Sequence, residues 1–263
     1  MALKRTTRTR LYRAAMYAVF FVVVAVVGFS INWERAIPQF FNLEVAAKLF
    51  PDIILIGLRN TILFTLIAFT GGLLLGIILA LMKLSSIPLF RWVATGWIEL
   101  FRGLPALLTI FSVAFIVPIV FGWKVPGGPV GAGLLGLILV ASAYIAEVIR
   151  SGIQAVPKGQ TEAARSLGMS PMKTMFWIIL PQGFRIIIPP MTNELVLLLK
   201  DTSLVFIAGS FIWSKELTTF ARDANSANAN ATPLIVAALL YLIVTIPLTR
   251  FTAWLERRMA RER

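Results

Sequence analysis

Six stretches of the chain are apolar over close to 20 residues, which is the length of α-helix that crosses about 30 Å of hydrocarbon. Of the 263 residues, 58% are hydrophobic and only 14% are charged, whereas about a quarter of the residues in a soluble domain are charged. The sequence therefore predicts an all-α integral membrane protein with six transmembrane helices. The predicted spans are 14–31, 53–82, 104–121, 131–149, 188–213 and 233–254.

Most of the 25 Lys and Arg residues lie in the N-terminal arm, the second and fourth connections and the C-terminal end. Connections rich in Lys and Arg stay on the cytoplasmic side of a membrane, so both termini are predicted to be cytoplasmic. Arg102 falls in the second connection, between the second and third predicted spans. The same distribution explains the formal net charge of +13, because the charges are dispersed around the spans. We therefore expect a lipid bilayer, and no nucleic acid, as a partner.

The chain contains no Cys and no His, which are the residues that supply most nucleophilic thiolates, general bases and transition-metal ligands. It also lacks the Gly-x4-Gly-Lys-Ser/Thr loop that binds nucleotide phosphates. The sequence therefore predicts no enzymatic activity, no cofactor and no metal site.

The connection over residues 150–185 is long, and it has the signals of two short helices. Pro157 breaks the preceding helix, Thr161 can cap a short helix, and Gly168 can end it. Ser170 and Pro171 then begin a second helix, predicted to end at Pro181. The residues alone leave two interpretations open: a lobe that docks onto a partner, or a simple link between two spans.

The same segment resembles a known family. The matching residues are Glu162, Ala163, Ala164, Gly168, Ile178, Leu180 and Pro181. They follow the Glu-Ala-Ala-x3-Gly-x9-Ile-x-Leu-Pro signature of permease subunits of binding-protein-dependent ABC importers. The flanking segments 143–147, 156–160 and 200–204 are similar to the branch that transports polar amino acids.

This resemblance implies a type I ABC importer permease. Its core would be five helices over 53–258, with the coupling lobe at 150–185, and residues 1–31 would add a basic arm and an extra helix. The coupling helix would be seated in a separate ATPase subunit. Its expected contact residues are Gly159, Glu162, Ala163, Ala164 and Gly168.

The resemblance also implies partners, a location and a mechanism. We expect ATP-binding ABC subunits, an extracytoplasmic amino acid binding protein, and a second permease subunit in a homodimer or heterodimer. The expected location is a bacterial cell membrane. The expected function is ATP-driven import, by alternating access, of polar amino acids such as glutamate, glutamine or basic amino acids, with ATP hydrolysed on the separate subunit.

The fifth predicted span carries an unusual set of polar residues. They are Asn193, Glu194, Lys200, Asp201, Thr202 and Ser203. A charged side chain at the centre of a bilayer costs about 2.5–3.5 kcal/mol on insertion scales, so these side chains should face a bundle interior or a water-filled cavity. Seven residues are close to two helical turns, so Asn193 shares a face with Lys200, and Glu194 shares the adjacent face with Asp201.

A zwitterionic amino acid needs a cation for its carboxylate and an anion for its ammonium group. Our hypothesis is that Lys200, Thr202 and Ser203 serve the carboxylate, while Glu194 or Asp201 serves the ammonium group or a cationic side chain. The alternative is a buried network of ion pairs with a purely structural role.

Two charge pairs and one pair of glycines are expected to have structural roles. Glu147 and Arg150 are three residues apart, as are Glu99 and Arg102, which favours intrahelical ion pairs over gating or substrate contact. The glycines at 72 and 76 form a small-x3-small pattern, which we expect to pack helices within one subunit.

Two other functions would also use a charged stripe inside a membrane. An ion-gradient-driven secondary transporter would need neither the capped cytoplasmic helix nor an ATPase partner. A non-transporting scaffold subunit of a permease pair would not need the polar residues of the fifth span for uptake.

Overall fold

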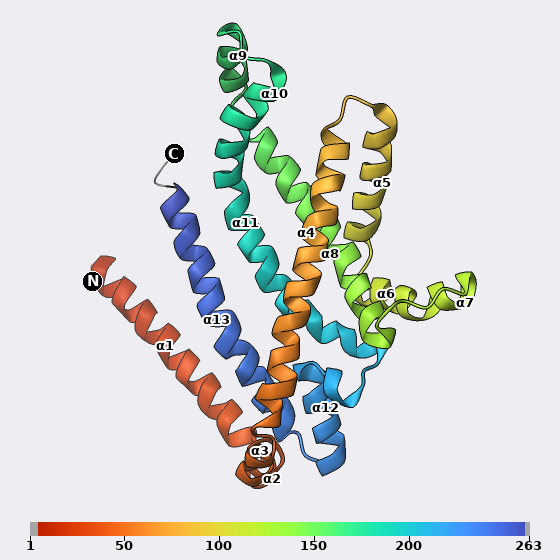
Figure 1. Ribbon diagram of the computed structural model, residues 1–263. Coiled ribbons are helices and arrows are strands. Elements are labelled where there is room, and N and C mark those ends of the chain that lie inside the picture. Colours follow the sequence, from red (N-terminus) through yellow and green to blue (C-terminus); the bar gives the residue numbers. More distant parts are fainter. Residues whose placement is uncertain (1–4, 261–263) are drawn as a thin grey trace.

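The computed structural model describes residues 5–260, and no strand occurs among them. Figure 1 shows a helical bundle that fans out from one end, where α2, α3 and α12 lie, toward the opposite end, where α9 and α10 project. The helices in chain order are α1 (Arg5–Ser30), α2 (Trp33–Phe40), α3 (Leu43–Lys48), η1 (Ile53–Leu58), α4 (Arg59–Leu84), α5 (Pro88–Gly103), α6 (Ala106–Phe111), η2 (Ser112–Ile116), α7 (Val117–Phe121), α8 (Gly128–Gln154), α9 (Lys158–Ser166), α10 (Pro171–Thr174), η3 (Met175–Ile179), α11 (Leu180–Asp201), η4 (Thr202–Ala208), η5 (Ile212–Ser214), α12 (Leu217–Asn228) and α13 (Thr232–Ala260).

Four helical segments of the described chain are long and apolar enough to cross a membrane. They are Tyr12–Ser30, Ile53–Leu84, Gly128–Gln154 and Thr232–Met259. A fifth crossing is possible if α5 and the α6–α7 segment, which meet at a bend of 108°, form one broken span. Helix α11 carries several charged residues and is not among these apolar segments.

Helices α4 and α8 form the centre of the bundle, where small residues let the two backbones approach. A Cβ atom added to Gly72 would lie 2.8 Å from the Cβ of Ala141, and one added to Gly76 would lie 2.7 Å from Cγ2 of Ile145. These distances are too short for real side chains, so both positions require glycine. The prediction that these glycines pack helices within one subunit is confirmed.

The third predicted span, 104–121, is wrong in its start and in its shape. Helix α5 begins at Pro88 and packs along α4 and α8, and the chain then breaks at Leu104 before Pro105 and turns into α6. Leu104 is extended (φ −88°, ψ 139°), because the residue before a proline disfavours helical backbone. Arg102 therefore lies in the last turn of α5, where its guanidinium contacts Tyr144 of α8. It is part of a helix and not of the connection in which it was predicted.

The lobe over residues 150–185 differs from prediction at its first helix. Helix α9 begins at Lys158, directly after Pro157, so Thr161 lies inside the helix and is not its cap. The predicted end is confirmed: Gly168 has a φ of +83°, and the N–H of Met169 donates to the carbonyl oxygen of Ala164 at 3.1 Å. This is the left-handed turn that glycine allows at a helix C-terminus.

The second helix of the lobe does not end at Pro181, as was predicted. Helix α10 continues through the π-helical turn η3 into α11, and Pro181 lies just after that turn. The predicted fifth span, 188–213, is also wrong at both ends. Helix α11 ends at Asp201 and tightens into the 3₁₀ helix η4, at whose start the Thr202 hydroxyl donates to the Leu199 carbonyl oxygen at 2.6 Å.

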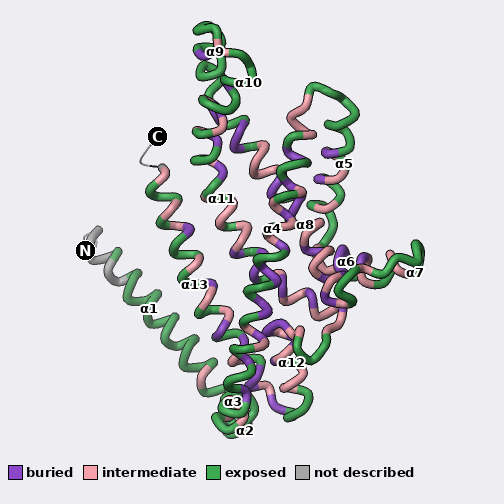
Figure 2. Tube along the Cα trace, viewed as in Figure 1, coloured by how far each residue is buried: buried purple, intermediate pink, exposed green. Residues whose placement is uncertain are grey.

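The N-terminal helix stands apart from the core. The apolar part of α1 buries none of its residues, and Figure 2 shows it exposed along almost its whole length. The segment that follows it is tied to the far end of the bundle, where the amide of Asn230 donates to the Pro38 carbonyl oxygen at 2.8 Å. Lys4 of the predicted basic arm, and Arg261 and Arg263 at the other terminus, lie outside the described residues.

Candidate functional site: a charged cavity at the α5–α6 break

A cavity of about 450 Å³ lies where α5 breaks into α6, against the middle of α8 and the second half of α11. Its lining residues are Arg102, Gly103, Leu104, Pro105, Ala106, Val140, Ala141, Tyr144, Glu194, Leu197, Leu198 and Asp201. The volume falls within the range of about 300–1,000 Å³ that small-molecule sites occupy.

The cavity lies near the middle of the membrane. Helix α8 has 27 residues, so it is about 40 Å long at 1.5 Å per residue, and Val140 and Tyr144 lie close to its centre. Non-helical backbone at membrane depth is tolerated where it lines a cavity, and the extended Leu104 does so.

The carboxylates of Glu194 and Asp201 line this cavity from α11. The two residues are two helical turns apart, so they share one face of the helix, and both are partly buried. Neither carboxylate forms an ion pair within the described part of the chain. The cavity therefore has two carboxyl groups on one wall, and no ion pair within the described residues occupies them.

The other predicted substrate residues do not line the cavity. Asn193 and Lys200 are exposed on a different face of α11. Thr202 is fully buried, and its hydroxyl is used in the hydrogen bond to Leu199. Ser203 is partly buried in η4. Of the six predicted residues, the structure brings only Glu194 and Asp201 together at this cavity.

Arg102 and Tyr144 belong to the cavity but were not predicted for it. The guanidinium carbon of Arg102 lies 5.5 Å from the centre of the Tyr144 ring, in a cation–π contact. The expected ion pair between Glu99 and Arg102 does not form among the described residues. The sequence signal that could have found Arg102 is its position two residues before Leu104-Pro105, where an apolar run must break.

A second charged cluster lies farther along α8, toward the lobe. The prediction of an intrahelical pair between Glu147 and Arg150 is confirmed. The structure adds Lys83 of α4, whose Nζ lies 3.3 Å from Oε2 of Glu147. One carboxylate therefore links two helices near the end of the bundle that carries the lobe.

The lobe presents one face of α9 to solvent. Gly159, Glu162, Ala163 and Gly168 are all exposed, whereas Ala164 is buried against the rest of the lobe. A face of small residues beside one acidic side chain is open to close approach by a partner. Leu167, the residue that caps the C-terminus of the same helix, is 85% exposed.

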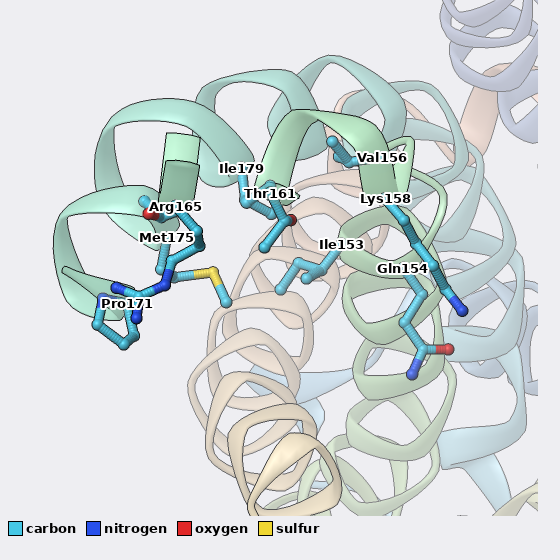
Figure 3. A pocket seen from close by; sticks show the side chains of 10 residues that line it. Ile153, Gln154, Val156, Lys158, Thr161, Arg165, Pro171, Met175 and Ile179 are labelled. Carbon is cyan, nitrogen blue, oxygen red and sulfur yellow. The ribbon is translucent and has the colours of Figure 1, made fainter. Parts of the chain in front are cut away.

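A cavity of about 730 Å³ lies beneath α9. Figure 3 shows Arg165 and Met175 on one side of it, with Ile153 and Lys158 on the other. Arg165 donates to the carbonyl oxygen of Met169. The side chains of Lys158 and Arg165 point in different directions (Figure 3), so they do not form a common binding site for an anion.

At the end of the bundle opposite the lobe, Glu216 is buried, with 1% of its surface exposed. Its carboxylate accepts hydrogen bonds from the backbone N–H groups of Thr218 and Thr219 at 2.6 and 2.7 Å, and from the hydroxyl of Tyr241 at 3.4 Å. Burial raises the pKa of the Glu216 carboxyl, while these threonine contacts oppose part of the rise. The carboxylate caps α12 and links it to α13.

Comparison with known sequences identifies relatives over most of the chain. Residues 72–261 match the family described as "Binding-protein-dependent transport system inner membrane component". The chain is 36% identical to the inner membrane amino-acid ABC transporter permease protein YhdY of Escherichia coli, over 77% of this chain and 55% of that protein. It therefore spans about half the length of that relative.

Two relatives from Bacillus subtilis are covered almost completely. The chain is 37% identical to the probable glutamine ABC transporter permease protein GlnM, over 77% of this chain and 91% of the relative. It is 36% identical to the arginine transport system permease protein ArtQ, over 83% of this chain and 98% of the relative.

Solved structures share the fold. A crystal structure of an amino acid ABC transporter with histidines superposes with a TM-score of 0.73 at 36% identity, covering 81% of this chain and 96% of that one. A chain of the MetNI methionine ABC transporter, in an inward-facing conformation, matches with a TM-score of 0.59 at 20% identity, covering 77% of this chain and 92% of that one. The second likeness concerns the fold alone.

Proposed function

Because the chain belongs to the family of binding-protein-dependent transport system inner membrane components, we propose that it is the permease subunit of an ATP-driven importer of polar amino acids. The relatives are permeases for amino acids, among them glutamine and arginine. The observation that carries the proposal is the cavity near mid-membrane, which has carboxylates on α11 and a guanidinium on α5. A zwitterionic solute requires charges of both signs, and an apolar pore would not supply them.

Transport in this proposal proceeds by alternating access. ATP binding draws two separate ATPase subunits together, α9 transmits their movement to the bundle, and the cavity opens outward to receive an amino acid from a binding protein. Hydrolysis returns the cavity to its inward-open state. The exposed Gly159, Glu162, Ala163 and Gly168 form the surface that meets the ATPase, while Ala164 holds α9 against the lobe.

The assembly follows from the same proposal. Two permease subunits, identical or related, enclose the pathway in the cell membrane, and both termini face the cytoplasm. Residues 53–258 are the five-helix core, and the basic arm and α1 are an addition to it. The exposure of α1 supports its peripheral place.

Within the cavity, Glu194 and Asp201 bind the ammonium group or a cationic side chain of the substrate. Both line the cavity, and neither is neutralised by an ion pair in the described chain. Lys200, which we expected to bind the substrate carboxylate, is exposed on another face of α11, so a different cation is needed for that group.

Reconstitution tests the proposed function directly. The permease is placed in proteoliposomes with its ATPase subunits, and its binding protein is added outside with labelled glutamine, arginine or glutamate. We expect uptake of at least one amino acid that requires ATP inside and persists when ionophores remove all ion gradients. Uptake that needs an ion gradient and no ATP would identify a secondary transporter. No uptake without a different, active permease would identify a scaffold subunit.

A further inference from the structure

The short helix α2 has an apolar face that the bundle does not cover. Its large apolar residues are Trp33, Ile37 and Phe40, and their spacing places them on one face of the helix. All three are exposed, and α2 buries none of its residues. Figure 2 shows this exposure at the end of the bundle opposite the lobe. The rest of the described chain therefore leaves the apolar face of α2 open.

The other side of α2 is polar. It carries Glu34, Arg35 and Gln39, which helical geometry places away from the apolar face, and both charged residues are exposed. A helix with one apolar face, one charged face and low overall hydrophobicity is typical of a segment that lies in the plane of a membrane interface.

Hydrogen bonds fix the orientation of α2 on the loop that precedes α13. The side-chain amide of Gln39 donates to the Ala229 carbonyl oxygen at 3.2 Å, and the N–H of Ala231 donates to the Gln39 carbonyl oxygen at 2.9 Å. The Asn230 amide adds its bond to the Pro38 carbonyl oxygen. Because Gln39 belongs to the polar side, these contacts hold the apolar face away from the loop. Helix α2 cannot turn to bury that face without breaking them.

The depth of α2 is set by the helix before it. The apolar segment Tyr12–Ser30 of α1 is long enough to cross a membrane, and two residues separate it from Trp33. The indole N–H of Trp33 donates to the Gly28 carbonyl oxygen at 2.8 Å, which holds the start of α2 against the last turn of α1. Helix α2 therefore begins at the level where the headgroups meet the acyl chains, a level at which tryptophan is enriched.

We propose that α2 is an interfacial anchor, lying in the plane of the membrane surface with Trp33, Ile37 and Phe40 in contact with phospholipid acyl chains. Lipid is the partner because this face continues the surface of α1, whose apolar segment is also unburied. Through its hydrogen bonds to the loop, the anchor fixes the depth at which α13 begins. Helix α2 lies outside residues 72–261, which match the family, so the anchor does not follow from that match or from the proposed function.

Spin labels at single cysteines test this depth, because the chain has no Cys of its own. The full chain is labelled with a nitroxide at Ile37→Cys and reconstituted in nanodiscs of phosphatidylethanolamine and phosphatidylglycerol. Arg35→Cys, at an exposed position on the polar side of the same helix, is the matched control. Collisions of the nitroxide with O₂, which enters the bilayer, are compared with collisions with a nickel chelate, which stays in water.

We expect the ratio of O₂ to nickel collisions to be several-fold higher at position 37 than at position 35. The ratio should place position 37 about 5–10 Å into the boundary between headgroups and acyl chains. A second pair of variants checks the assignment of the faces: Phe40→Cys should behave as Ile37→Cys does, and Glu34→Cys as Arg35→Cys does.

Two results would overturn the proposal. Frequent nickel collisions at position 37, equal to those at position 35, would place the apolar face in water, where a soluble partner could dock. Rare collisions with both reagents at position 37 would show that protein covers this face, as contact with a second copy of the chain would. Neither result bears on ATP-dependent uptake, so each is distinguishable from a failure of the proposed function.

Discussion

Gly72 of α4 lies so close to Ala141 of α8 that a Cβ on the glycine would come within 2.8 Å of the alanine Cβ. Ala141 also lines the charged cavity, so this contact sets the position of one cavity wall. The close packing of α4 and α8 is therefore part of the structure of the site.

We expect Gly72→Val to destabilise the permease by about 1–3 kcal/mol, because the added atoms overpack a close helix contact. Gly96→Ala is the matched control, since nothing lies within 4 Å of a Cβ at Gly96; its effect should range from neutral to about 1 kcal/mol of stabilisation. Thermal unfolding in detergent measures both. Equal unfolding temperatures for the two variants would contradict the packing described for α4 and α8.

Glu216 should make stability depend on pH. Its pKa is raised by burial in the folded protein, so the folded state holds the proton more tightly than the unfolded state does. Its contribution to stability is therefore full below the ordinary carboxyl pKa and is lost as pH rises through the raised value. Unfolding temperatures measured from pH 4 to pH 8 should decline over this window in wild type. Glu216→Gln should flatten that part of the profile, and an unchanged slope in the variant would assign the pH dependence to another group.

The exposed face of α9 should matter for partner binding and not for folding. Ala163 is exposed and Ala164 is buried. We expect Ala163→Phe to leave the unfolding temperature of the isolated permease unchanged while it prevents co-purification of the ATPase. Ala164→Phe should lower the unfolding temperature, because the lobe has no room for the ring. Lys173→Ala, at an exposed position on α10, is the control, and it is expected to change neither the unfolding temperature nor the co-purification of the ATPase. Normal co-purification of the ATPase with Ala163→Phe would argue against this docking face.

The sequence predicted the apolar helices and the lobe because both depend on local patterns. Long apolar runs, the basic residues between them, and Gly168 at the end of α9 each act within a few turns of helix. The α5–α6 break was missed because charged residues on α5 lower its apolarity, so the hydrophobic count began only at residue 104. The effect of Pro105 on Leu104 is local, but its consequence, a bent span that brings Arg102 to α8, depends on tertiary packing.

The candidate site was partly predictable for the same reason. The seven-residue spacing places Glu194 with Asp201 and Asn193 with Lys200, and this follows from helix geometry alone. Which of the two faces meets the cavity depends on how α11 packs against α8, which no periodicity in α11 can specify. The substrate role was therefore expected for Lys200, and the structure places a different cation, Arg102, in the cavity.

The most direct measurement is ATP-dependent uptake by proteoliposomes that contain Glu194→Gln together with Asp201→Asn. The double variant keeps the shape of the cavity and replaces both carboxyl groups on its α11 wall with neutral amides. We expect uptake to fall at least about tenfold, as the loss of one charge-assisted contact predicts. Glu99→Gln, which alters an exposed carboxylate outside the cavity, should transport as wild type does. Undiminished uptake by the double variant would show that the amino acid does not pass through this cavity.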